Sequence, residues 1–247
     1  FIETTGVQGF RLDAIKHIDS FFMGNFIRDI TAKYGEDFYV FGEFWNGDET
    51  ANNDYLESID YRFDLVDVKL HQNFFDASRA GSDFDLRTIF DQTLAKNHPE
   101  SAVTFVDNHD TQRGQALEST VEEWFKPASY ALILLREEGL PCVFYGDYYG
   151  ISGEFAQESF QEVLDKLLDV RLNLAYGEQT DYFDDANCIG WTRQGKDGGQ
   201  PIAVVVSNDQ ASSKRMLVGS EWAGKEFCDY LGKSSQIVTI DEEGWGE

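Results

Sequence analysis

Three acidic side chains in this sequence could do nucleophilic or acid–base chemistry together. Asp13, Glu43 and Asp110 each stand at or just after the end of a predicted strand. In a repeating strand and helix fold, one repeat takes about 30 residues, and catalytic groups lie at the carboxyl ends of the strands. Asp13 and Glu43 are one such repeat apart, and Asp110 follows about two repeats later. The spacing predicts that all three carboxyl groups lie on one rim of one sheet.

The neighbours of two of these acids suggest different roles. Arg11 precedes Asp13 by two residues in a strand, so both side chains point to the same face, and the guanidinium keeps the acid ionised. An ionised carboxylate can act as a nucleophile. Glu43 is followed by Phe44 and Trp45, and apolar surroundings favour a protonated carboxylic acid. Cleavage of a glycosidic bond needs one group of each kind, and aromatic rings stack on sugars. The alternative is an ordinary ion pair and surface or capping carboxylates.

Metal motifs receive little support from the residues themselves. An EF-hand loop counted from Asp107 needs glycine at its sixth position, where the chain has Gln112, so this interpretation is rejected. His17 and His109 lack the spacing of a zinc motif. His71 is expected on a helix surface and is assigned no role.

Composition limits the kinds of partner. The 247 residues include 45 acidic and 20 basic side chains, a formal charge of −25, which argues against a nucleic-acid partner. No run approaches the roughly 18 apolar residues of a membrane span, so no membrane partner is expected. The three cysteines are widely spaced and suit reduced thiols, which favours a cytoplasmic protein over a secreted one. The chain begins at Phe1, neither an initiator methionine nor a signal peptide, as if cut from something longer.

The elements that position the acids alternate between strand and helix. This alternation predicts an α/β fold with parallel strands and right-handed crossovers. Strands are predicted over residues 7–12, 38–43, 61–65, 102–106 and 142–145. Helices are predicted over 19–34, 66–77, 86–96, 120–138 and 160–174. The helix over 86–96 is better defined than the one over 66–77, and Pro127 is expected to kink the helix over 120–138.

The pattern changes after residue 177. Short predicted strands are separated there by clusters of Gly, Asn, Asp and Ser, which is typical of antiparallel β structure. The strands are predicted over 188–192, 202–207, 214–218, 226–231 and 236–240. We therefore expect two domains, residues 1–177 and 178–247.

Three segments of the chain resemble catalytic segments of the α-amylase family, glycoside hydrolase family 13. They are residues 9–17, 42–45 and 105–111, in the order found in the family. Residues 112–118 and 143–147 resemble the bacterial liquefying and cytoplasmic members. The resemblance implies the C-terminal portion of a (β/α)8 TIM barrel, about its last five strands, and then a truncated C-terminal antiparallel β domain. The family's N-terminal half would be a missing partner of this chain.

The resemblance also implies roles for individual residues. Asp13 would be the nucleophile, Glu43 the acid and base, and Asp110 the acid that holds the sugar in the transition state. The backbone carbonyl of His17 would be one ligand of a structural calcium. Substrate contacts are implied for Arg11, Lys16, His17, Trp45 and His109.

The implied reaction is the retaining endo-hydrolysis of α-1,4-glucosidic bonds in starch-type or glycogen-type glucans. The chain on its own is expected to be inactive, because half a barrel has two unpaired strand edges. Two alternatives remain: a non-catalytic piece that binds α-glucan, and a glucanotransferase or branching enzyme of the same family.

Overall fold

The computed structural model describes residues 1–247, which form two compact units that interleave along the chain. The first unit comprises Phe1–Asn73, Phe90–Phe105 and Glu138–Cys142. The second comprises Phe74–Ile89, Val106–Glu137 and Val143–Glu247.

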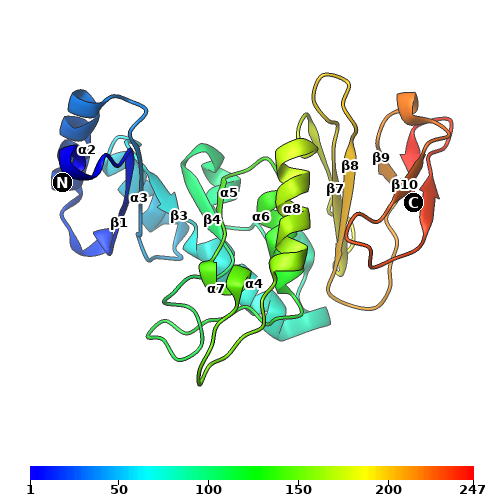
Figure 1. Ribbon diagram of the computed structural model, residues 1–247, viewed down its shortest axis with the longest axis horizontal. Coiled ribbons are helices and arrows are strands. Elements are labelled where there is room, and N and C mark those ends of the chain that lie inside the picture. Colours follow the sequence, from blue (N-terminus) through cyan, green and yellow to red (C-terminus); the bar gives the residue numbers. More distant parts are fainter. The chain divides into compact units, whose positions relative to one another are not determined.

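A five-stranded parallel sheet forms the centre of the first unit (Figure 1). Its strands follow the chain order, so every strand pairs with the next along the sequence. They are β1 (Gly9–Leu12), β2 (Tyr39–Gly42), β3 (Asp64–Val66), β4 (Ala102–Phe105) and β5 (Leu140–Cys142). Because all neighbours are parallel, their carboxyl ends share one edge of the sheet. The predicted parallel direction of the strands is thus confirmed, and β1 and β5 lie at the edges of the sheet.

Short polar caps fix where the helices of the first unit begin. The Asp19 side chain accepts a hydrogen bond from Phe22 N at the start of α2, as its place before the apolar periodicity predicts. Asp48 caps α3 in the same way. The α-helices that belong wholly to this unit are α1 (Ile2–Thr5), α2 (Ser20–Tyr34), α3 (Glu49–Ser58) and α5 (Leu94–Asn97). Two 3-10 turns, η1 (Ile15–His17) and η4 (Pro99–Ser101), also belong to this unit. A third turn, η3 (Leu86–Thr88), belongs to the second unit.

The helix predictions after β3 need correction. The continuous helix is α4 (Val68–Ala80), whereas residues 86–96 contain only η3 and the start of α5. Gln92 has a φ of 61°, a left-handed conformation that interrupts any helix through this segment. The apolar residues there are buried without forming one helical face. His71 lies in α4 and is fully buried, so its expected place on a helix surface was wrong.

Helices pack against antiparallel sheets in the second unit. The α-helices are α6 (Lys126–Leu134), α7 (Tyr145–Tyr149) and α8 (Gln161–Asn173), with η2 (Gly81–Asp83) and η5 (Ser220–Trp222) as short turns. The antiparallel strands form three sheets: β6 (Gln179–Tyr182), β7 (Cys188–Arg193) and β8 (Ile202–Ser207); β9 (Met216–Leu217) with β12 (Trp245–Gly246); and β10 (Glu226–Cys228) with β11 (Ile237–Thr239). All five predicted strands are present, but β6 and β12 were missed.

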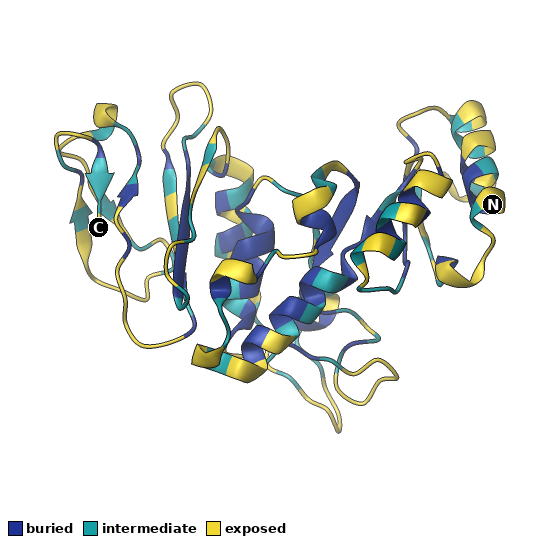
Figure 2. Ribbon diagram, turned by 180° about the vertical axis from the view of Figure 1, so that it is seen from behind, coloured by how far each residue is buried: buried dark blue, intermediate teal, exposed yellow.

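Helix α6 also differs from its prediction, because it begins near Pro127 instead of being kinked there. Proline is tolerated in the first turn of a helix, where its missing N–H has no partner to lose. Most of α6 is buried (Figure 2), and it packs against α8 and β8. The fully buried Trp191 on β7 lies 5.5 Å from the Arg136 guanidinium just after α6. Helix and sheet therefore share one core in this unit.

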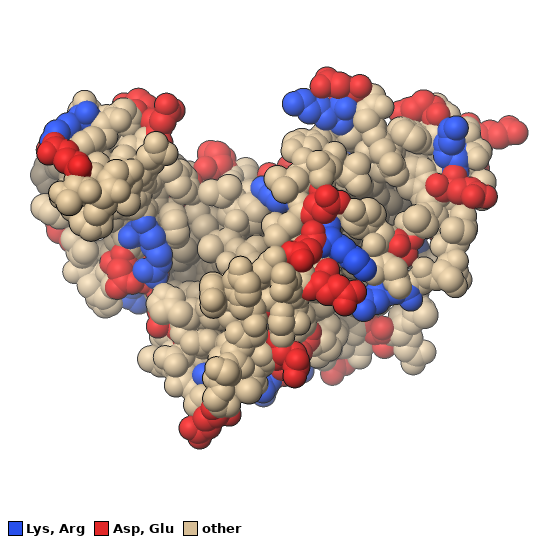
Figure 3. Space-filling view, in the orientation of Figure 1, with Lys and Arg blue, Asp and Glu red and all other residues tan.

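The charged side chains are mostly at the surface. On the face drawn in Figure 3, Lys and Arg side chains mostly lie beside Asp and Glu side chains. None of the helices has both the length and the apolar character needed to cross a membrane.

Candidate active site

The ends of β1 and β2 are joined by a series of hydrogen bonds that positions two of the predicted catalytic acids. Glu43 N donates to Leu12 O at 2.8 Å, and Ile15 N donates to Glu43 O at 3.1 Å. Between them, Ala14 N donates to the Glu43 side chain, Oε2, at 3.0 Å. Ala14 reaches this position with a φ of 48°, a strained conformation for alanine. The turn after β1 is therefore shaped around the carboxyl group of Glu43.

Arg11 contacts both acids. Its Nη1 lies 2.7 Å from Asp13 Oδ1, and its Nη2 lies 3.3 Å from Glu43 Oε2. The pairing with Asp13 was predicted, and the contact with Glu43 was not. The two carboxyl groups differ in exposure, with 73% of the Asp13 side chain accessible and 8% of the Glu43 side chain. One guanidinium thus holds an exposed carboxylate and a buried one close together.

Two of the other predicted substrate residues lie beside these acids. Lys16 Nζ donates to the carbonyl oxygen of Trp45 at 3.1 Å, which links η1 to the segment after β2. His17 ends η1 with an exposed side chain. The Trp45 ring packs against the buried cluster of Val66, Val68, Val103 and Phe105 at the centre of the sheet.

His71 completes an aromatic group with Trp45. Its ring is stacked on Phe105, with centroids 5.1 Å apart and planes inclined by 10°, and the Trp45 centroid lies 6.1 Å from it. The sequence pattern predicts that His71 lies on a helix, but it does not predict the contacts of its ring. The partner rings, Phe105 and Trp45, come from β4 and from the segment after β2. The buried histidine is thus one support of the Trp45 ring.

Asp110 and His109 form their own pair in the second unit. They lie in the loop that follows β4, where His109 Nε2 is 3.2 Å from Asp110 Oδ2. The loop turns around Asn108, whose Oδ1 accepts hydrogen bonds from Asp110 N at 2.8 Å and Thr111 N at 3.0 Å. Since β4 is parallel to β1 and β2, this loop leaves the sheet at the edge where those strands also end. The meeting of Asp110 with Asp13 and Glu43 stays a prediction.

Two further acids after strand ends were missed. Asp67 directly follows β3 and is fully buried, and it accepts hydrogen bonds from Leu70 N at 3.0 Å and Ala95 N at 2.8 Å. Asp107 follows β4 and is paired with the buried Lys126. Burial raises the pKa of each carboxyl group to about 6. The hydrogen bonds to Asp67 and the charge of Lys126 beside Asp107 lower the pKa, but burial has the larger effect. The sequence feature that could have identified both acids is their position shortly after a predicted strand.

The calcium implied by the resemblance has one expected ligand in this chain, the backbone carbonyl of His17. No group of three or more His, Cys, Asp or Glu side chains is placed to hold a metal ion. The backbone carbonyl of His17 could supply one oxygen, whereas calcium takes about six to eight oxygen ligands. Calcium therefore enters no step of the mechanism proposed below.

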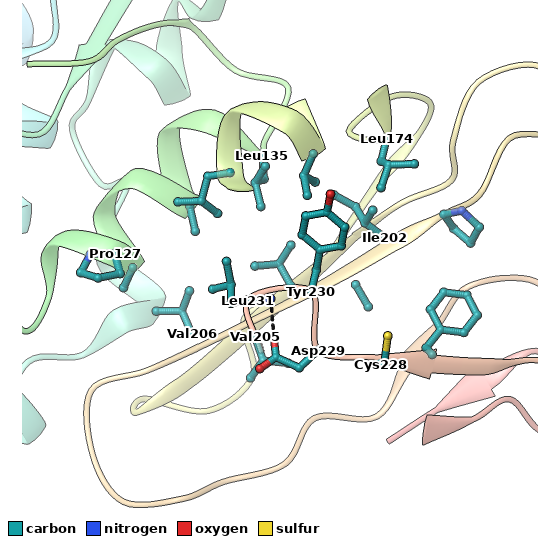
Figure 4. Close-up of a pocket in the computed structure, with 18 of the residues that line it drawn as sticks. Pro127, Leu135, Leu174, Ile202, Val205, Val206, Cys228, Asp229, Tyr230 and Leu231 are labelled. Atoms are coloured by element: carbon teal, nitrogen blue, oxygen red, sulfur yellow. Dashed lines mark hydrogen bonds between the residues drawn. The ribbon is translucent and has the colours of Figure 1, made fainter. Parts of the chain in front are cut away.

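An apolar pocket of about 470 Å³ lies in the second unit, between α6, α8, β8 and residues 226–231 (Figure 4). None of the predicted catalytic residues lines it. In Figure 4, the Asp229 carboxylate accepts a hydrogen bond from Leu231 N at 3.0 Å and so shapes the loop at the pocket's border. Tyr230 is also held in place, by a hydrogen bond from its hydroxyl to Asp169. The pocket thus has an ordered rim but no acid–base pair directed into it.

Comparison with solved structures supports the fold. The alpha-amylase of Geobacillus thermoleovorans complexed with acarbose matches with a TM-score of 0.70 at 20% identity, over 100% of this chain and 58% of that one. An Anoxybacillus alpha-amylase matches with a TM-score of 0.69 at 21% identity, over 99% of this chain and 57% of that one. At these identities the likeness concerns the fold alone.

Sequence comparison is more specific. An alpha-amylase of Geobacillus stearothermophilus is 45% identical over 100% of this chain and 45% of its own length. The cytoplasmic alpha-amylase of Escherichia coli is 39% identical over 98% of this chain and 51% of its own length. The chain thus spans about half the length of these curated relatives. Family models described as alpha amylase, catalytic domain, and alpha-amylase C-terminal match residues 1–199 and 202–247. The chain belongs to the alpha-amylase family.

Proposed function

We propose that this chain carries the catalytic acids of a retaining endo-hydrolase of α-1,4-glucosidic bonds in starch-type or glycogen-type glucans. The observation that supports this most directly is the contact of one guanidinium, that of Arg11, with both Asp13 and Glu43. A shared guanidinium keeps the two carboxyl groups close together, as a retaining glycosidase requires of its two carboxyl groups, which lie about 5 to 5.5 Å apart. The relatives named above are alpha-amylases.

Exposure suggests which acid has which role. Asp13 is paired with Arg11 and open to solvent, as suits an ionised nucleophile that reaches the anomeric carbon. Glu43 is buried beside Phe44 and receives a hydrogen bond from Ala14 N on one oxygen, Oε2, which leaves Oε1 to protonate the leaving oxygen. After the leaving group departs, the same carboxylate activates the water that releases the sugar.

The remaining predicted residues would bind substrate around this pair. Asp110 would hydrogen-bond the sugar at the cleavage point, and His109, 3.2 Å from Asp110, would contact the same ring. Lys16, His17 and Trp45 would line the leaving-group side, with the Lys16 ammonium fixed on the Trp45 carbonyl. The structural calcium implied for the His17 carbonyl would need its other ligands from outside the described residues.

The wider predictions concern the barrel, the domains and the location of the protein. The five parallel strands would be about the last five of a (β/α)8 barrel, spanning residues 1–177, and residues 178–247 a C-terminal antiparallel β domain. The N-terminal half of the same enzyme would complete the barrel. All three cysteines are unpaired, which supports a cytoplasmic location.

The test is Glu43→Gln in a fusion protein that places the N-terminal half of the Geobacillus stearothermophilus relative before this chain. We expect the fusion protein to raise reducing ends from amylose, and Glu43→Gln to lower this rate at least about 100-fold while amylose binding persists. Glu57→Gln, an exposed glutamate on α3, is the matched control and should retain the rate.

Other outcomes contradict the proposal in distinct ways. An unchanged rate in Glu43→Gln would remove its catalytic role. Amylose binding without any turnover by the unmodified fusion protein would favour the glucan-binding alternative. Chain-length redistribution without new reducing ends would favour a glucanotransferase.

A further inference from the structure

A buried network of charged side chains lies at the start of α6, outside the proposed catalytic residues. Lys126 is fully buried, and its Nζ lies 2.9 Å from Asp107 Oδ2 and 3.0 Å from Gln157 Oε1. The same ammonium is hydrogen-bonded to Asp147, which is also fully buried. Lys126 thus links three segments of the second unit: the loop after β4, α7, and the loop before α8.

Neutral hydrogen-bond donors hold Asp147, one of the two carboxylates that pair with Lys126. Tyr130 donates its hydroxyl to Asp147 Oδ2 at 2.6 Å, and Gln157 Nε2 donates to Asp147 Oδ1 at 2.7 Å. With Lys126 these donors satisfy both oxygens of a carboxylate that has no access to water. Asp147 therefore anchors the ammonium at one position.

Asp107, the other carboxylate that pairs with Lys126, is hydrogen-bonded to the loop that carries Asp110. Asp107 accepts a hydrogen bond from Thr111 Oγ1 at 2.9 Å, and a weaker one from Val121 N at 3.3 Å. Thr111 Oγ1 in turn accepts from Asn108 N at 2.9 Å. Asn108 Oδ1 receives the backbone N–H of Asp110. An unbroken series of contacts therefore connects Lys126 with the backbone of Asp110.

Stability alone is a poor explanation for this arrangement. Two carboxylates and one ammonium are removed from water, and such a group often stabilises a fold less than apolar residues of the same volume. Burial raises the pKa of Asp107 to about 6, which reflects this cost. What the charges do provide is a fixed geometry for Asp107, since each of its oxygens has a defined donor.

We propose that Lys126 is a positioning residue, which holds through Asp107 and Thr111 the turn that presents Asp110 and His109 to the substrate. The inference rests on the proposed function for its catalytic consequence, but the positioning itself can be measured without activity. Lys126 touches no substrate in this assignment and acts only through the loop.

The first test measures amide hydrogen exchange in the 247-residue chain. We expect Lys126→Met to speed exchange at the amides of Asp110, Thr111 and Val121 by about tenfold or more, with β7 amides unchanged. Arg136→Met removes another buried cation, whose carboxylate partner Asp181 lies 2.7 Å away on β6. This control should instead speed exchange around β6 and β7 and leave the Asp110 loop as it is.

A second variant covers the case in which Lys126→Met does not fold. Thr111→Val removes the hydroxyl that joins Asp107 to Asn108, but keeps the volume and all three buried charges. It should give the same local increase in exchange at Asp110 and Thr111. If either folded variant leaves this loop as protected as before, or changes it no more than Arg136→Met does, the inference is overturned.

The second test uses the fusion protein described above. Lys126→Met should lower kcat about tenfold or more while KM stays within about twofold, because misplacing a group that acts in the transition state slows the chemical step. Arg136→Met should leave kcat within about twofold. A loss confined to KM would overturn the inference, whereas an inactive unmodified fusion protein would count against the proposed function and leave the exchange result standing.

Discussion

The guanidinium of Arg11 connects the two carboxyl groups that follow β1 and β2, those of Asp13 and Glu43. The contact of Arg11 with Asp13 follows from their spacing in a strand, and the structure confirms it at 2.7 Å. The second contact of Arg11, with Glu43, depends on how two strands pair, which no local pattern contains. Asp67 was missed for a similar reason, because its donors come from two separate helices, α4 and α5.

Asp67 gives a prediction about pH and stability. Its folded pKa of about 6 is raised from an ordinary value of 3.8, because burial disfavours the carboxylate more than the backbone donors favour it. The neutral acid is therefore the better-tolerated form in the folded state. Its contribution to stability is fully present below about pH 4 and is lost as the pH rises through about 6.

Asp67→Asn should remove this dependence. Lowering the pH from 7 to 4 should stabilise the unmodified chain relative to the variant by up to about 3 kcal/mol, since one pKa unit corresponds to about 1.4 kcal/mol. Urea unfolding at several pH values measures the difference. The exposed Asp76→Asn on α4 is the control and should follow the unmodified chain. If the free energies of unfolding of Asp67→Asn and the unmodified chain differ by the same amount at pH 4 and at pH 7, the raised pKa of Asp67 is contradicted.

Whole elements were predictable where local signals and packing agree. Helix α2 has a capping aspartate, a buried stripe that includes Met23 and Ile27, and a glycine directly after its end, and its predicted bounds are confirmed. Residues 86–96 have apolar periodicity without such agreement. Leu86 N there donates to Ala186 O, so the start of this segment is held by a contact with a residue far along the chain. Periodicity alone does not decide which side chains are buried, since Phe22 and Phe26 on the periodic face of α2 are exposed.

The cap of α2 can be tested directly. Asp19→Ala removes the acceptor that lies 2.8 Å from Phe22 N and should lower the free energy of unfolding by about 1 kcal/mol. Asp29→Ala removes an exposed acid from the same helix, paired only with the neighbouring Arg28, and should change it by less than about 0.5 kcal/mol. Urea titrations followed by far-ultraviolet circular dichroism provide the comparison. Equal effects of the two substitutions would show that the cap contributes nothing specific.

The whole molecule raises the question of what surrounds the parallel sheet. In the described chain β1 and β5 each pair with one neighbour only, whereas a closed barrel leaves no edge strand. The chain corresponds to about 45% of the length of its Geobacillus stearothermophilus relative. Membership of the family was readable from three short segments, because side chains that perform the same chemistry recur at the same strand ends. Their joint geometry was not readable, because it depends on strands that pair far along the chain.

The isolated 247-residue chain should therefore hydrolyse starch poorly or not at all. Glycoside cleavage needs its carboxyl groups held to within a fraction of an ångström, and a sheet with two open edges leaves the Asp13 turn on an edge strand. The fusion protein with the N-terminal half should hydrolyse starch, with reducing ends measured at equal molar concentration. The same fusion protein carrying Glu43→Gln controls for activity contributed by the added half. Full starch-degrading rates from the isolated chain would contradict this prediction, because they would show that β1 needs no second neighbour to hold its catalytic turn in place.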